Sequence, residues 1–122
     1  MSDARAITAG ALISAERVRG TDVFDAAGAK LGTVDDVMLD KASGQAVYAV
    51  VVSGGFLGVG GTHRPLPWAA LSYDGVSGGY VVHLDKAKLD AAPGYGTSPD
   101  FDWTADYARS VDDYYKLTGQ AP

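Results

Sequence analysis

The sequence predicts a mainly β fold, a small and strongly bent antiparallel barrel followed by short C-terminal helices. Three observations support this prediction. Glycine occurs 16 times in 122 residues, which is typical of the many tight turns in small barrels. Short apolar segments of strand length recur between these turns, and a helical apolar stripe appears only near the C-terminus. A chain of this length fits one domain with one core.

Three strands are expected in the first half of the chain, where they form a meander. They span 18–25, 31–40 and 45–53, and turns that contain glycine separate them. Ahead of the first strand, residues 14–17 fit a single helical turn, because Ser14 is a favourable N-cap residue.

The second strand requires an irregularity. Val34 has the opposite parity from Val37 and Leu39, although alternate residues of a strand share a face. A β-bulge near Asp35 and Asp36 would bring the three apolar side chains to one face and bend the sheet. We therefore expect a bulge there. Its two acids are interpreted as solvated charges, with hydrogen bonds from backbone amides as the alternative for Asp36.

The third strand is apolar on both faces, since residues 47–52 are all apolar or aromatic. A strand of this kind is usually central in its sheet and covered on both sides. We expect the core to cover one face. Either a helix or another subunit would cover the other face.

The second half of the chain adds an edge strand, a hairpin and a helix. Residues 62–67 contain two prolines, which favour the edge of a sheet. Glycines bracket a hairpin at 73–79, and the last strand follows at 80–84. Asp85 is a suitable N-cap for a short helix that continues through Leu89.

The tail from about 102 to 118 has the pattern of an amphipathic helix. Asp112 and Lys116 stand four residues apart on its polar face, in the order that favours an ion pair. Packing of the apolar stripe on its own barrel and packing on a second subunit or another protein both remain open. The apolar stripe consists of Trp103, Tyr107, Val111, Tyr114 and Leu117.

Three segments in this order resemble the PRC-barrel family. They are 22–37, which contains the sequence DVFDAAGAKLGTVDDV, 50–58 with VVVSGGFLG, and 64–71 with RPLPWAAL. The resemblance covers about residues 14–94. It implies a strongly bent PRC-type barrel that serves as an adaptor or assembly domain.

The resemblance also suggests a division of the chain and possible relatives. We expect a flexible arm at 1–13, the PRC-barrel domain at 14–94, and a linker with an amphipathic helix at 95–122. The family includes the cytoplasmic domain of the photosynthetic reaction-centre H subunit and the C-terminal domain of a ribosome-maturation factor that acts in 16S RNA processing. The Gly-Gly-Phe-Leu loop is more similar to the reaction-centre branch.

Composition excludes several classes of function. Cysteine is absent, so disulfides, thiolate catalysis and cysteine-ligated zinc are excluded. The net charge of −5 disfavours binding to nucleic-acid phosphates. No apolar run approaches the roughly 18 residues that would span a bilayer, and the N-terminus lacks the pattern of a signal peptide. We therefore expect a cytoplasmic protein without membrane insertion.

No motif predicts an active site, a cofactor or a metal. The glycine-rich loop at 54–61 lacks the features of a phosphate-binding loop, because His63 stands where a third glycine belongs and a strand follows. His63 and His83 are interpreted as residues on strand surfaces rather than metal ligands. The serines lie in no nucleophile-elbow context. We therefore predict that the protein is not an enzyme.

The sequence favours a bacterial, non-enzymatic adaptor that forms a homodimer and binds an unidentified protein partner. Its partner is expected in a membrane-associated or photosynthesis-related complex. An RNA- or ribosome-associated processing module and a barrel that senses a small ligand or ion are the alternatives. The predicted interaction residues are Phe56, Leu57, Val59, Trp103, Tyr107, Val111, Tyr114 and Tyr115.

Overall fold

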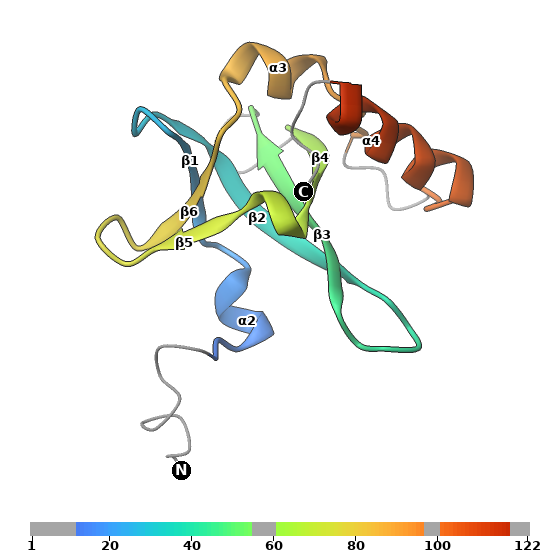
Figure 1. The fold of residues 1–122 in the computed structure, drawn as a ribbon, viewed down its shortest axis with the longest axis horizontal. Helices are drawn as coiled ribbons and strands as arrows, with labels where there is room; N and C mark the ends of the chain where they lie inside the picture. Colours follow the sequence, from blue (N-terminus) through green and yellow to red (C-terminus); the bar gives the residue numbers. More distant parts are fainter. Residues whose placement is uncertain (1–11, 55–60, 97–100, 118–122) are drawn as a thin grey trace.

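The computed structural model describes residues 12–54, 61–96 and 101–117. Figure 1 shows one curved sheet with its helices around it. In chain order the elements are α2 (Ala15–Val18), β1 (Asp22–Asp25), β2 (Lys30–Leu39), β3 (Ala46–Ser53), β4 (Thr62–Pro67), the 3-10 helix η1 (Trp68–Ala70), β5 (Ser72–Asp74), β6 (Gly79–Val82), α3 (Lys86–Ala91) and α4 (Ala105–Leu117).

The prediction of a mainly β fold with short C-terminal helices is confirmed. The six strands form one sheet in the order β4-β3-β2-β1-β6-β5. The order begins with β4 and ends with β5, so the sheet is bent but not closed into a barrel. One pair, β1 with β6, is parallel, whereas the other pairs are antiparallel. The sheet is therefore mixed, because the returning chain adds β6 beside β1.

The first strand is shorter than the sequence pattern predicts. Ser14 caps α2 as expected, and its hydroxyl oxygen accepts a hydrogen bond from the Arg17 amide at 3.3 Å. Val18 therefore ends a helix and does not begin a strand. The chain joins the sheet after Gly20, whose amide donates to the Val34 carbonyl at 2.8 Å. The strand itself begins at Asp22.

The predicted bulge in β2 is confirmed. The register with β3 shifts between Val34 and Asp36, and the Asp36 carboxylate accepts the Val37 amide at 2.8 Å. Val34 is buried and Val37 packs against the core, but Leu39 is 58% exposed. Leu39 is the last residue of β2, next to a second register shift whose extra residue, Val47, lies in β3.

Strand β3 is covered on both faces, as predicted. Val50 and Val51 are both fully buried, although neighbours in a strand point to opposite faces. Val51 belongs to the main core cluster. On this strand the Tyr48 ring contacts the Trp103 ring, with centroids 5.5 Å apart, and Tyr48 hydrogen-bonds to α4. The second cover therefore includes the tail of the same chain.

Strand β4 lies at an edge of the sheet, as its prolines predict. The His63 amide and carbonyl both pair outward with Tyr95, at 2.7 and 2.9 Å. Backbone groups alternate in direction along a strand, so Pro65 and Pro67 share this outward orientation. Both lack an N–H group. The edge therefore offers no amide donor at these two positions, which protects it from pairing with other strands.

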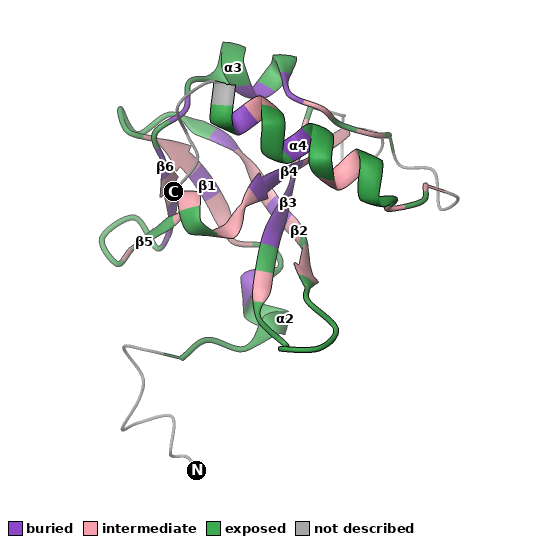
Figure 2. Cartoon of the chain, turned by 45° about the vertical axis from the view of Figure 1, so that its right-hand side comes forward, coloured by how far each residue is buried: buried purple, intermediate pink, exposed green. Residues whose placement is uncertain are grey.

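The core lies between the sheet and the helices (Figure 2). Asp85 caps α3 by accepting the Lys88 amide at 2.9 Å, and this helix places Leu89 in the core with no exposed area. The buried cluster contains Val18, Val23, Leu31, Val34, Tyr48, Ala49, Val51, Leu66, Tyr80, Val82, Leu84, Leu89, Ala92, Val111 and Tyr115.

Candidate functional site

Helix α4 packs on its own sheet and α3. Val111 and Tyr115 are 0% and 1% exposed, and the Tyr114 hydroxyl donates to the Lys88 carbonyl at 2.6 Å. Trp103 and Tyr107 are half-buried against the core. Figure 2 shows exposed positions along the outer side of this helix. Packing within the chain, one of the two alternatives left open by the sequence, therefore accounts for the burial of Val111 in the stripe and of Tyr115 beside it.

An aromatic cluster holds the linker and α4 against β4. The rings of His63 and Tyr95 stack with centroids 5.1 Å apart, and Tyr95 stacks on Phe101 at 3.9 Å. Trp103 and Tyr107 meet edge to face at 5.2 Å. Sequence reasoning did not include Tyr95 or Phe101, because neither belongs to the helical stripe. The bridge to β4 places Tyr95 in the cluster, and Phe101 joins it by stacking on Tyr95.

Asp35 connects the bulge of β2 to two other elements. Its carboxylate lies 3.2 Å from His63 Nε2, and its carbonyl accepts a hydrogen bond from Arg19 Nε at 2.8 Å. The sequence shows no acid near His63, so this pair arises only from the fold. His83 is exposed. Among the described residues, no group of three or more acids and histidines is arranged to hold a metal ion.

The other predicted interaction residues, Phe56, Leu57 and Val59, lie outside the described residues. Gly54 and Gly61, the described residues on either side of 55–60, have positive φ angles of 77° and 92°. Such angles favour glycine over other residues.

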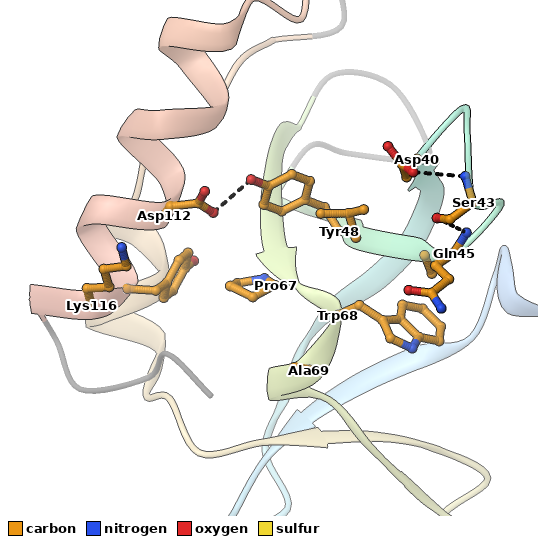
Figure 3. A pocket seen from close by; sticks show the side chains of 12 residues that line it. Asp40, Ser43, Gln45, Tyr48, Pro67, Trp68, Ala69, Asp112 and Lys116 are labelled. Atoms are coloured by element: carbon orange, nitrogen blue, oxygen red, sulfur yellow. Dashed lines mark hydrogen bonds between the residues drawn. The ribbon is translucent and has the colours of Figure 1, made fainter.

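An open groove of about 540 Å³ separates the end of α4 from the β2–β3 turn (Figure 3). Its floor comes from β3, the end of β4 and η1. The residues that line it are Asp40, Ser43, Gln45, Ala46, Val47, Tyr48, Pro67, Trp68, Ala69, Asp112, Tyr115 and Lys116. Because they come from three distant parts of the chain, no local motif indicates the groove.

One wall of the groove carries Asp112 of α4. The Tyr48 hydroxyl donates to Asp112 Oδ1 at 2.7 Å (Figure 3). Burial raises the pKa of Tyr48, and the hydrogen bond and negative charge of Asp112 raise it further. Tyr48 thus remains a neutral phenol that donates a hydrogen bond to the carboxylate of Asp112. Asp112 and Lys116, which the sequence spacing favours as a pair, do not form an ion pair in the described structure.

The opposite wall is the β2–β3 turn, which holds Asp40. The Asp40 carboxylate accepts the Ser43 amide at 2.9 Å, and the Ser43 hydroxyl accepts the Gln45 amide at 3.2 Å. Hydrogen bonding from the Ser43 backbone and side chain lowers the pKa of Asp40. Asp40 therefore carries a negative charge at neutral pH. Figure 3 shows Asp40 and Asp112 on different sides of the groove.

The floor of the groove is apolar. Met38 pairs with Tyr48 and Leu39 with Ala46, so Val47 is the extra residue of a bulge. Its side chain is 42% exposed. Trp68 is half-buried and lies edge to face against Tyr80, with ring centroids 5.7 Å apart. The floor therefore offers an aliphatic and an aromatic side chain close to the charged walls.

These features define a small, mainly β domain built on one bent sheet, with an amphipathic helix packed against it. The family model of the PRC-barrel domain matches residues 11–89, and the chain belongs to this family. A comparison with curated proteins finds no match. Helix α4, which supplies one wall of the groove, lies beyond the matched residues. No helix in the described part of the chain has the length and apolar character to cross a membrane.

Proposed function

We propose that this PRC-barrel protein is a non-enzymatic adaptor or assembly module that acts through protein–protein contacts. The observation that carries the proposal is the groove between α4 and the β2–β3 turn. Its volume of about 540 Å³ lies within the range of ligand-binding clefts. An apolar floor with a few oriented polar groups is the usual composition of a recognition site.

The setting of the groove also supports a docking role. Hydrogen bonds hold an acid on each wall of the groove, Asp40 through its own turn and Asp112 through Tyr48. A surface that is already ordered loses little entropy when it binds a partner. The resemblance to the reaction-centre H subunit favours a partner in a membrane-associated or photosynthetic complex. A homodimer is part of the proposal, and light scattering after size exclusion would measure it.

Affinity capture from the source organism, with the full chain as bait, tests the adaptor function. We expect the unaltered chain to retain a defined partner that a Val47→Asn/Ala69→Gln double variant retains poorly. Both positions are exposed, so the double variant should remain folded, which its melting temperature verifies. Val76→Asn, at a 97% exposed position of the β5–β6 turn, is the matched control.

Equal recovery of the partner by the double variant and by the unaltered chain would contradict docking in the groove. Recovery of ribosomal RNA that weakens with added salt would favour the RNA-associated alternative instead, because phosphate contacts are strongly salt-dependent.

A further inference from the structure

We infer that the groove recognises a protein segment that carries a lysine or arginine next to a large apolar side chain. The inference rests on the proposed function and specifies the chemistry of the partner. Its basis is the placement of two carboxylates on the walls, Asp40 and Asp112, beside an apolar floor that includes Val47 and Trp68.

The two carboxylates are available to a cation. One oxygen of Asp112 accepts the Tyr48 hydroxyl, which leaves its other oxygen free of hydrogen bonds from the described residues. The Asp40 carboxylate accepts hydrogen bonds from its own turn, but these donors are neutral and Asp40 is exposed to solvent. Neither acid has a basic partner among the described ion pairs. A lysine or arginine that enters the groove would supply the missing positive charge.

The floor explains why an apolar side chain should accompany the cation. Val47 is 42% exposed and Trp68 is half-buried, so a partner side chain placed over them would remove apolar area from water. The face of an aromatic ring also attracts a lysine or arginine head group. The groove thus suits a cation with an apolar neighbour better than an isolated ion.

Charge complementarity extends beyond the groove. The chain has a net charge of −5, which attracts basic segments from a distance and repels acidic partners. Lys116 is the one basic residue among those that line the groove, against two acids. A ligand that carries a phosphate group would be repelled by this excess of negative charge. A basic and apolar protein segment is therefore the occupant that the site favours.

Selection from a random library of displayed octapeptides, with the full chain as the target, tests the inference. We expect enrichment of peptides with arginine or lysine beside leucine, isoleucine, phenylalanine or tryptophan. Fluorescence anisotropy of an enriched peptide should show weaker binding as salt increases, since exposed charge pairs are screened. A library that shows no enrichment, or enrichment of acidic or purely apolar peptides, would overturn the inference.

A pair of neighbouring substitutions isolates the carboxylate. Asp112→Asn keeps an acceptor for the Tyr48 hydroxyl but removes the charge, and should weaken binding of the enriched peptide about fivefold. Asp113→Asn is the matched control, because Asp113 is also exposed on α4 but does not line the groove. It should change the affinity less than about 1.5-fold. Equal effects of the two variants would contradict a role for Asp112.

The two proposals can fail separately. If Val47→Asn/Ala69→Gln abolishes partner capture while Asp112→Asn has no effect on affinity, the groove is a docking site and the cationic chemistry is wrong. If the double variant leaves capture intact, docking in the groove itself is wrong. A dimer that the double variant converts to monomers would assign the groove to a second copy and overturn the basic-segment inference.

Discussion

Two tyrosine hydroxyls near α4 have opposite environments. The Tyr48 hydroxyl donates to the Asp112 carboxylate at 2.7 Å. The Tyr107 hydroxyl is buried, and no described residue serves as its hydrogen-bond partner. A buried polar group without a partner destabilises the folded state, whereas a hydrogen bond to a charged group stabilises it. The Tyr48 hydroxyl therefore stabilises the folded state, whereas the Tyr107 hydroxyl destabilises it.

Substitution of each tyrosine by phenylalanine separates these contributions. Tyr107→Phe should leave the free energy of unfolding unchanged or raise it by up to about 1 kcal/mol, because it removes the unpaired hydroxyl. Tyr48→Phe should lower it by about 1 kcal/mol, because Asp112 loses its donor. Urea denaturation at pH 7 measures both. A greater loss of stability in Tyr107→Phe than in Tyr48→Phe would contradict this account.

At the scale of elements, the close pairing of β2 with β3 depends on a glycine. A Cβ atom at Gly32 would lie 2.5 Å from the Val52 carbonyl oxygen and 2.8 Å from a Val51 methyl group. The first of these neighbours is backbone in the middle of the sheet, so the strands would have to move apart. The small size of Gly32 thus matters more than its backbone conformation.

Gly32→Ala should therefore lower the free energy of unfolding by about 2 kcal/mol, the usual cost of overpacking. Gly75→Ala is the matched control, since a Cβ at Gly75 meets no atom within 4 Å. Its effect should stay within about 0.5 kcal/mol. Thermal unfolding followed by circular dichroism compares the two variants. Similar melting temperatures for both would show that β2 and β3 accommodate the added methyl group.

The stability of the whole molecule should decline in alkaline solution because several tyrosines are buried. Burial raises the pKa of Tyr107 to about 12, and burial is also the main cause of the raised pKa values of Tyr48 and Tyr115. In the unfolded chain a tyrosine has a pKa near 10. The folded state thus favours the neutral phenol. This contribution is fully present below about pH 10 and is lost as the pH rises toward the folded-state pKa.

We expect urea midpoints to remain level up to about pH 9.5 and to fall between about pH 10 and 12. Tyr107→Phe should show a shallower decline over the same range, because one of the raised groups is absent. A decline of the same slope in this variant would contradict the contribution of Tyr107.

Much of the local structure could be predicted from the sequence. The caps at Ser14 and Asp85, the bulge beside Asp36 and the edge strand with its two prolines all follow from preferences that act over a few residues. The pattern failed where two local signals competed. The capped turn of α2 continued to Val18, and Leu39 is exposed at the last position of β2, beside a second bulge.

The site required the tertiary structure. Its walls unite Asp40, Tyr48 and Asp112, and the hydrogen bond between the last two joins residues 64 positions apart. The parallel pairing of β1 with β6 and the contact of Asp35 with His63 also arise only from the tertiary structure. Hydrophobic period and turn chemistry determine which segments form strands and helices. Which of these segments become neighbours depends on how their apolar faces pack together, and that packing alone created the groove.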